Sequence, residues 1–399
     1  MPKNIVILCD GTSNQIEEDR TNILRLYGCL RKNDRQVVFY DPGVGTFGGE
    51  NDWLRTTRKT KEVWGLATGW GLDHNVKEAY RFLVEHFDPG KKKTAAKPAV
   101  PQDDIYIFGF SRGAYTASVL AGFIHAFGIM DLVQINLLDY AYRTYKGISE
   151  RDATPENPNA PFLPMRLYER ALTPHRPDIK ALGLFDTVAS VIELGKVWPQ
   201  LRTHPFTRKN PSVQHVRRAV AIDERRTMFN PVLWELGGSF TGPPFKKREA
   251  VPQDAKEVWF SGVHGDVGGG YEEEKSAQAK LPLLWMIREM EEIGLKVYES
   301  TVRKIVLGED PKHPSYVKPG VGQKINISMT RAWRVVEFLP RKVPTTSHRA
   351  RGGGGVYIPR SDHRSMPENA EIHESVFERM KADPSYRPVN LPASALGKV

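Results

Sequence analysis

The chain has 399 residues, 40% of them hydrophobic, and a formal net charge of +10. This length allows one large α/β domain or two smaller ones, and this hydrophobic content is ordinary for a soluble globular core. No run approaches the roughly 18 uncharged apolar residues that span a bilayer, and no signal-peptide cleavage pattern follows the first apolar run. We therefore expect a soluble protein that is cytoplasmic as synthesised. Any export of this protein is expected to follow a signal-independent route.

The charge and the cysteines point to partners and compartment. The basic residues are scattered among 47 acids, which favours transient contact with an anionic membrane surface over nucleic-acid readout. Only Cys9 and Cys29 are present, and they predict two buried thiols rather than a disulfide framework.

The first hundred residues alternate between strand and helix patterns. Lys3–Cys9 and Gln36–Tyr40 are short apolar runs followed by polar or glycine-rich loops, so they predict strands. Between Asp73 and Phe87 the apolar residues recur at helical spacing, which predicts a helix packed on a sheet.

The stretch Asp104 to Leu120, DIYIFGFSRGAYTASVL, combines an apolar run of strand length, a turn and a small apolar helix. Ser111 lies between Gly109 and Gly113 in a G-x-S-x-G pattern. Such a nucleophile elbow exposes a serine hydroxyl at the end of a sheet. The alternative interpretation is a plain corner between a strand and a helix.

The rest of the chain continues the alternation. A helix is expected at Ile129–Tyr145, and further strands at Ile179, at His215–Ile222 and around Val258; helices follow at Leu281–Tyr298 and Ile372–Met380. The predicted fold is an α/β-hydrolase-like α/β domain over residues 1–300, with a mostly parallel central sheet flanked by helices. Lid-like insertions are expected at 129–178 and 191–212, and an irregular C-terminal extension packed on the core at 301–399.

Chemically useful side chains follow the strands of this expected sheet. In open parallel sheets the ligand site lies beyond the carboxyl ends of the strands. One site can therefore collect the residues at those ends, which are Asp10, Ser111, Asp186, Asp223 and His264.

A serine nucleophile needs a base, and the base needs an orienting carboxylate. We assign the base to His264, which follows an apolar strand in a glycine-rich loop; His373 competes but lies on a polar helix, where exposure is the default. For the acid we favour Asp186, because a strand-terminal Asp followed by Thr suits a buried carboxylate. Asp223, beside two arginines, and Asp266, which suits an Asx turn, remain alternatives.

The oxyanion of an acyl-transfer intermediate needs preformed donors. The N–H of Arg112, the residue after the nucleophile, is one, and Gly11 and Thr12 are expected to supply the second. Asp10 is equally compatible with capping its loop. The Arg112 side chain either contacts an anionic substrate or braces the turn. No His/Cys spacing indicates a metal site, and the chemistry needs no cofactor.

Five motifs in order resemble the DUF2235 family of α/β-hydrolase-like proteins, which includes the Tle1 class of type VI secretion phospholipase effectors. They lie between about residues 3 and 290: CDGTSN, GFSRGAYTA, GLFDTVAS, WFSGVHGDVGGGY and LPLLWMI. The resemblance implies a lipolytic triad at Ser111, Asp186 and His264, a lipid ester substrate, and a secretion apparatus or immunity protein as partner. Gly265 departs from the His-Ser-Asp that the family loop usually has.

The sequence thus predicts a serine hydrolase that cleaves carboxylic esters through an acyl-enzyme on Ser111, acting as a lipase or phospholipase. Two alternatives stay open. One is an esterase or amidase for a water-soluble substrate, and the other is a non-catalytic binding protein with a hydrolase fold.

Overall fold

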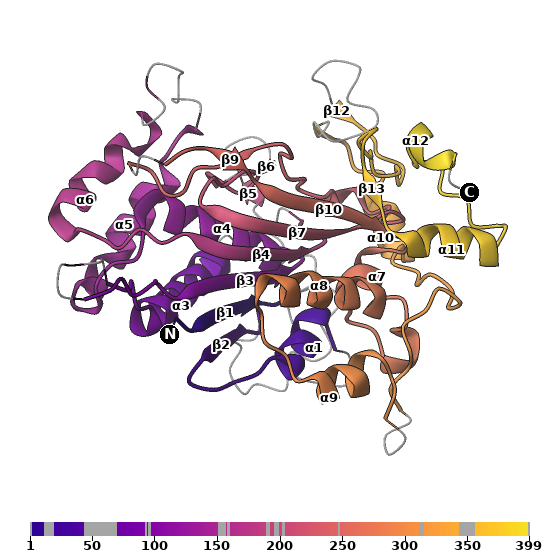
Figure 1. Ribbon diagram of the computed structural model, residues 1–399. Coiled ribbons are helices and arrows are strands. Elements are labelled where there is room, and N and C mark those ends of the chain that lie inside the picture. The colour runs from indigo at the N-terminus through magenta and orange to yellow at the C-terminus, as the bar shows by residue number, and fades with distance from the viewer. Residues whose placement is uncertain are drawn as a thin grey trace, which may run out of the picture.

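The computed structural model describes residues 2–11, 20–43, 70–91, 94, 97–150, 157, 160–188, 192–194, 199–201, 204–245, 248–310, 315–342 and 356–397. Within them a seven-stranded sheet, all of whose strands are parallel, forms the centre of the molecule (Figure 1). The expected parallel α/β sheet is confirmed. Its strands, in spatial order, are β13 (Glu371–Ile372), β10 (Asp254–Phe260), β7 (Val213–Ala221), β4 (Ile179–Phe185), β3 (Asp104–Phe110), β1 (Asn4–Cys9) and β2 (Gln36–Asp41).

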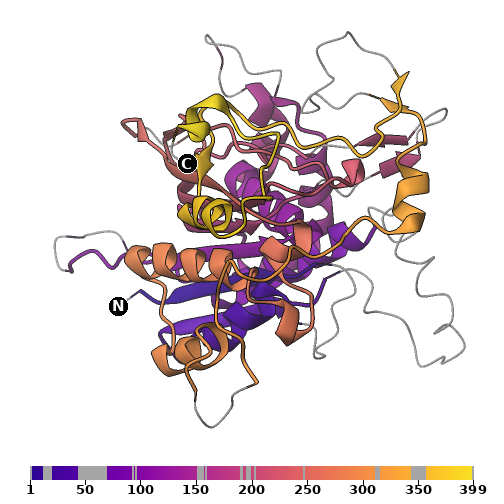
Figure 2. The same cartoon turned by 90° about the vertical axis from the view of Figure 1, so that its right-hand side faces the viewer.

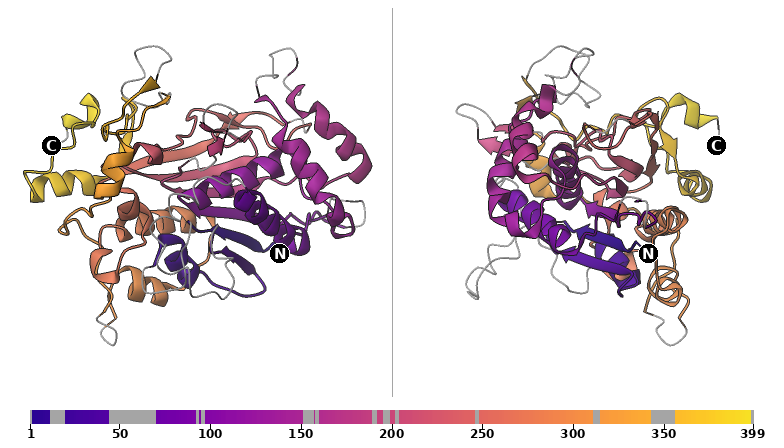
Figure 3. Two further views of the ribbon diagram at one scale, coloured as in Figure 1. Left: turned by 180° about the vertical axis from the view of Figure 1, so that it is seen from behind. Right: turned by 60° about the vertical axis from the view of Figure 1, so that its left-hand side comes forward.

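Both faces of the sheet are apolar and covered. Along β1, Ile5 and Ile7 contact one hydrophobic cluster and Val6 and Leu8 the other, because successive side chains of a strand alternate between faces. Figure 3 shows helices on both sides of the sheet. The first cluster takes in α3 (Trp70–His86), α4 (Arg112–Phe127) and α5 (Leu138–Lys146), and the second takes in α1 (Asn22–Cys29), α8 (Lys280–Ile293) and the π-helical turn η8 (Val302–Val306).

The remaining described elements are short. The helix expected over Ile129–Tyr145 is a 3₁₀ turn followed by α5, and α8 ends at Ile293 because Gly294 is left-handed there. The short helices are η3 (Leu132–Leu137), η5 (Ala160–Met165), α6 (Arg166–Leu172), η6 (Thr227–Phe229), α7 (His264–Gly268), η7 (Glu273–Lys275), α9 (Glu299–Thr301), α10 (Arg331–Val336), α11 (Glu374–Ala382) and α12 (Ala393–Leu396). Three antiparallel pairs are β5 (Ile192–Leu194) with β6 (Pro199–Leu201), β8 (Ser239–Phe240) with β9 (Val251–Pro252), and β11 (Arg341–Lys342) with β12 (Val356–Tyr357).

The structure describes parts of the expected insertion at 129–178 and of the C-terminal region at 301–399. The described part of 129–178 carries α5 and α6 and leads into the start of β4, so it lies at the opposite end of the sheet from α7 (Figure 1). It therefore does not cover the carboxyl ends of the strands. Much of 191–212 lies outside the described residues. The 301–399 region contributes β13, an edge strand of the central sheet, and packs α11 on β7 and β10.

Two further features concern membrane-spanning helices and the cysteines. No helix of the described residues is long and apolar enough to cross a bilayer. Cys9 and Cys29 are both buried free thiols, as predicted.

Candidate active site

The turn between β3 and α4 has the geometry of a nucleophile elbow. Ser111 adopts φ 58° and ψ −123° there, a conformation that L-residues rarely adopt. A Cβ at Gly113 would lie 2.2 Å from the carbonyl oxygen of Cys9, and one at Gly109 would lie 2.4 Å from that of Gly113. Both positions therefore require glycine, because α4 starts in direct contact with the ends of β1 and β3.

Ser111, His264 and Asp186 form one continuous hydrogen-bonded chain. His264 is the first residue of α7, and its Nε2 lies 2.8 Å from the Ser111 Oγ. Its Nδ1 lies 2.5 Å from Oδ2 of Asp186, the residue that follows β4. With the proton on Nδ1, the imidazole donates to the carboxylate and Nε2 accepts from the serine hydroxyl. All three side chains are buried, each less than a tenth exposed.

Arg364 completes the surroundings of the Asp186 carboxylate. Its Nη1 donates to Oδ1 at 2.6 Å and its Nη2 to Oδ2 at 2.9 Å, a bidentate pair. The same two nitrogens donate to the carbonyl oxygens of Ala221 and Phe229. The N–H of Ala221 donates in turn to Oδ1. The carboxylate is therefore fixed by the C-terminal region as well as by the strand end.

Burial and charge oppose each other at Asp186. Burial raises the pKa of this carboxyl, whereas the Arg364 charge and the hydrogen bonds from His264 and Arg364 lower it. The lowering effects prevail, and the pKa lies below its ordinary value. Asp186 is thus an anion throughout the neutral range, as an orienting acid needs to be.

Aromatic rings enclose the imidazole. The Phe110 ring lies 4.7 Å from that of His264, centroid to centroid, and the Phe229 ring packs edge-on at 5.0 Å. Trp333 of α10 in turn packs edge-on against Phe229 at 5.5 Å. These contacts exclude water from the imidazole and restrict its rotation, which strengthens its polar bonds.

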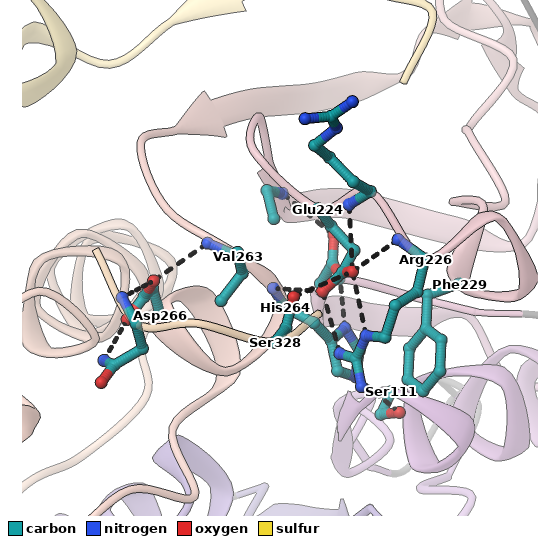
Figure 4. Close-up of polar contacts among 12 residues, drawn as sticks. Ser111, Glu224, Arg226, Phe229, Val263, His264, Asp266 and Ser328 are labelled. Carbon is teal, nitrogen blue, oxygen red and sulfur yellow. Dashed lines mark hydrogen bonds and ion pairs between the residues drawn. The ribbon is translucent and has the colours of Figure 1, made fainter. Parts of the chain in front are cut away.

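Glu224 holds the backbone of the histidine turn. Figure 4 shows its carboxylate between Arg226 and the N–H of His264, which donates to Oε2 at 3.2 Å. Arg226 donates to both carboxylate oxygens, and Ser328 donates to Oε1. Burial raises the pKa of Glu224, but the Arg226 hydrogen bonds and charge lower it to about 2. The side chain is therefore a permanent anion that positions the start of α7.

The expected oxyanion donors stay a prediction. Arg112 begins the 16-residue helix α4, whose dipole favours negative charge at this end. The Gly11 N–H donates to Oδ1 of the preceding residue, Asp10, at 2.6 Å. Thr12 lies outside the described residues. Burial lowers the pKa of Arg112 to about 10, so its side chain remains a cation at neutral pH.

Asp10 braces a loop. Its Oδ2 accepts from the Thr21 hydroxyl at 2.5 Å and from the Tyr40 hydroxyl at 2.9 Å, in addition to the Gly11 bond at Oδ1. These bonds correspond to the loop-capping alternative, and they join the ends of β1 and β2 to the start of α1.

The other acids and the second histidine have separate partners. Asp223 accepts from the Gly262 N–H and the Tyr386 hydroxyl, and burial raises its pKa to about 6. Asp266 accepts from the Val263 N–H, within its own loop, and from Asn326. His373 caps α11 by accepting from the Ser375 N–H. Among the described residues, no three His, Cys, Asp or Glu side chains cluster as metal ligands.

Comparison with known families agrees with the motifs. A sequence model described as "T6SS, Phospholipase effector Tle1-like, catalytic domain" matches residues 3–289, more than half of the chain. The chain belongs to this Tle1-like family. The matched range contains Ser111, Asp186 and His264 and ends before Arg364.

Individual relatives of this Tle1-like chain are distant. The uncharacterized protein YEL023C of Saccharomyces cerevisiae is 32% identical over 235 residues, which are 57% of this chain and 32% of that protein. A crystal structure of an uncharacterized protein from Pseudomonas aeruginosa is 18% identical with a TM-score of 0.40, covering 79% of this chain and 49% of that one. A Tle1 effector bound to the VgrG spike of a type VI secretion system is 17% identical with a TM-score of 0.31, covering 68% and 51%. The chain thus spans about a third to a half of the proteins it matches.

Sequence reasoning missed Arg364 and Glu224. Arg364 lies 178 residues from Asp186 in a region without periodic pattern, so no local signal indicates its role. Glu224 directly follows Asp223 at the end of a predicted strand. An acidic residue at a strand end is a signal in the sequence that could have identified Glu224. Asp223 lies beside two arginines in the sequence, but Glu224 is the acid that pairs with Arg226.

Proposed function

We propose that the chain is a serine hydrolase that cleaves carboxylic esters of lipids through an acyl-enzyme on Ser111. The observation that carries this proposal is the hydrogen-bonded chain from Ser111 through His264 to Asp186, at a strained elbow after a central strand. This arrangement has the geometry of a nucleophile, its base and the acid that orients the base.

In the proposed reaction His264 Nε2 takes the Ser111 hydroxyl proton while Oγ bonds to the ester carbonyl carbon. The carbonyl electron pair moves to oxygen, and the N–H groups that begin α4 stabilise the resulting anion. Collapse breaks the bond to the alcohol oxygen, which leaves with the proton from His264. Water then attacks the acyl-enzyme, with His264 again transferring the proton, and releases the fatty acid.

The substrate and partner follow from the family rather than from the site. The family is described as phospholipase effectors of type VI secretion, which supports a phospholipid substrate and contact with a secretion apparatus. The rings of Phe110 and Phe229 beside the imidazole give the site an apolar wall. Such a wall suits an acyl chain better than a charged substrate group.

The test compares two serines of the same region. The Ser111→Ala variant is expected to lose labelling by a fluorophosphonate and to lose at least about 10⁴-fold in kcat/KM for esters. Ser118→Ala is the matched control, because the Ser118 hydroxyl donates only to the Ala114 carbonyl within α4. Labelling of both variants contradicts the proposal. Absence of labelling in both the wild type and Ser118→Ala also contradicts it.

Substrate comparison separates the alternatives. Phospholipid vesicles, short-chain soluble esters and amides are offered to the wild-type chain under the same conditions. Preference for vesicles supports the lipase, whereas turnover of soluble esters or amides alone supports the water-soluble alternative.

A further inference from the structure

An exposed apolar surface surrounds α10, and we call it the α10 face. In Figure 2, α10 lies at the outer edge of the molecule. Four large apolar side chains on and around it are between 57% and 86% exposed: Ile327, Val335, Phe338 and Leu339. Large exposed apolar side chains this close together in the sequence favour an interaction surface over isolated surface residues.

The charged residues that line a cavity in the α10 face are all arginines. Arg225, Arg334 and Arg360 line a cavity of about 380 Å³ together with Met329, Phe338 and Ser361. None of the three guanidinium groups pairs with a carboxylate among the residues that the structure describes. Guanidinium groups bind phosphate oxygens through paired N–H donors, so the cavity fits a phosphate group with an apolar chain beside it.

A strained turn holds this cavity in shape. Arg360 and Ser361 have φ of 54° and 61°, so two successive non-glycine residues are left-handed. Such a conformation costs energy and persists only where surrounding contacts impose it. Here Arg225 Nε donates to the Ser361 carbonyl at 2.9 Å, and the Arg360 N–H donates to the Glu337 carbonyl at 3.1 Å.

The α10 face is continuous with the candidate active site. Trp333 of α10 packs on Phe229, which packs on the imidazole of His264. Arg226, next in sequence to Arg225 of the cavity, lies over the Phe229 ring at 3.9 Å. The side chains of Trp333 and Phe229 thus lie between the α10 face and His264.

We propose that the α10 face docks the protein on an anionic phospholipid bilayer. The exposed apolar side chains enter the acyl boundary, and the three arginines bind lipid phosphates. The net charge of +10 adds a longer-range attraction to the same surface. This inference rests on the proposed function only for its purpose, which is to deliver lipid esters to Ser111.

A second exposed apolar cluster shows why the charge matters. Leu132 and Val133 of η3 and Leu167 of α6 are also exposed, and α6 lies at the end of the sheet opposite α7 (Figure 1). There Asp131 and Glu169 accompany the basic residues. This mixed charge does not complement an anionic bilayer, so the second cluster provides matched controls.

The experiment measures partitioning of the full chain carrying Ser111→Ala, which prevents hydrolysis of the vesicles. Vesicles contain phosphatidylcholine alone or phosphatidylcholine with phosphatidylglycerol in a two-to-one ratio. Arg334→Gln with Arg360→Gln is expected to lower the partition coefficient on the anionic vesicles about 30-fold. Phe338→Ser with Leu339→Ser is expected to lower it about tenfold.

The control variants are Arg35→Gln with Arg170→Gln, and Leu132→Ser with Val133→Ser; all four residues are exposed. They are expected to partition like the parent. Equal partitioning of the α10 variants and the parent overturns the proposal, as does an equal loss in the controls. The proposal is also overturned if the α10 variants bind vesicles like the parent but no longer self-associate in vesicle-free buffer.

A second measurement distinguishes this inference from the proposed function. With Ser111 restored, the α10 variants are expected to hydrolyse a soluble short-chain ester at the parental rate. Vesicle binding that fails while ester hydrolysis is normal refutes only the docking face. Binding that depends on the α10 face in a chain without esterase activity refutes only the proposed function.

Discussion

Arg364 offers the sharpest test of how the C-terminal region supports the triad. The Arg364→Gln variant removes the positive charge from beside Asp186 and leaves the carboxylate with two donors, His264 and the Ala221 N–H. Arg364→Lys keeps the charge and loses the bidentate geometry. The two variants therefore separate the electrostatic effect of Arg364 from its positioning effect.

The expected size of the electrostatic effect follows from the bond lengths. Bonds of 2.5 and 2.9 Å that share Asp186 Oδ2 link the imidazole to the guanidinium. At a separation of roughly 5 Å and an effective dielectric constant of about 20, two unit charges interact by about 3 kcal/mol. The other charges facing His264, Glu224 and Arg226, pair with each other and are unchanged.

The sign is set by the Arg364 charge, which lowers the pKa of Asp186, so without it this carboxyl binds a proton at higher pH. The acidic limb of the kcat/KM profile for a soluble ester is expected to move to higher pH in Arg364→Gln. In Arg364→Lys the limb is expected to stay in place, while the plateau falls by up to about 10²-fold because the carboxylate is misplaced.

Loss of stability alone must be separated from this effect. Breaking a buried ion pair costs about 3–5 kcal/mol, so both variants are assayed well below their melting temperatures. Arg217→Gln is the control, because Arg217 is equally buried and pairs with Asp254 and Glu289. An unmoved acidic limb in Arg364→Gln, or an equal shift in Arg217→Gln, refutes the reasoning.

Two further predictions concern stability. Ser111→Gly is expected to be about 1 kcal/mol more stable to denaturant than Ser111→Ala, because glycine adopts φ 58° without strain and both variants lose the bond to His264. Asp223→Asn is expected to gain up to about 2 kcal/mol relative to wild type between pH 4 and pH 7. The pKa of Asp223 is raised to about 6 in the folded state, so its contribution to stability falls as pH rises from the unfolded value through 6.

Each has a clear contrary result. Equal unfolding free energies for Ser111→Gly and Ser111→Ala would mean that the elbow stores no strain. A constant stability difference between Asp223→Asn and wild type across that pH range would mean that the folded Asp223 carboxyl has an ordinary pKa.

Local patterns in the sequence were sufficient for the elbow and the sheet. The run before Gly109, the glycines around Ser111 and the small apolar helix after it are contiguous, so hydrophobic period and glycine placement specify them without distant partners. The same holds for the strands that end at Asp186 and before His264. Parallel topology then brings the ends of those strands to one edge, which is why the three candidate residues were predictable.

The choice among candidate acids and the role of the C-terminal region depended on tertiary contacts. Asp186, Asp223 and Asp266 all follow or lie near strand ends, and only the tertiary structure decides which carboxylate meets the imidazole of His264. Arg364 reaches Asp186 across 178 residues of sequence, a contact that no local periodicity encodes. Sequence fixes strand period and turn geometry because they arise between neighbours in the chain. Burial, ion pairing and the exposure of the α10 face arise only when distant segments meet.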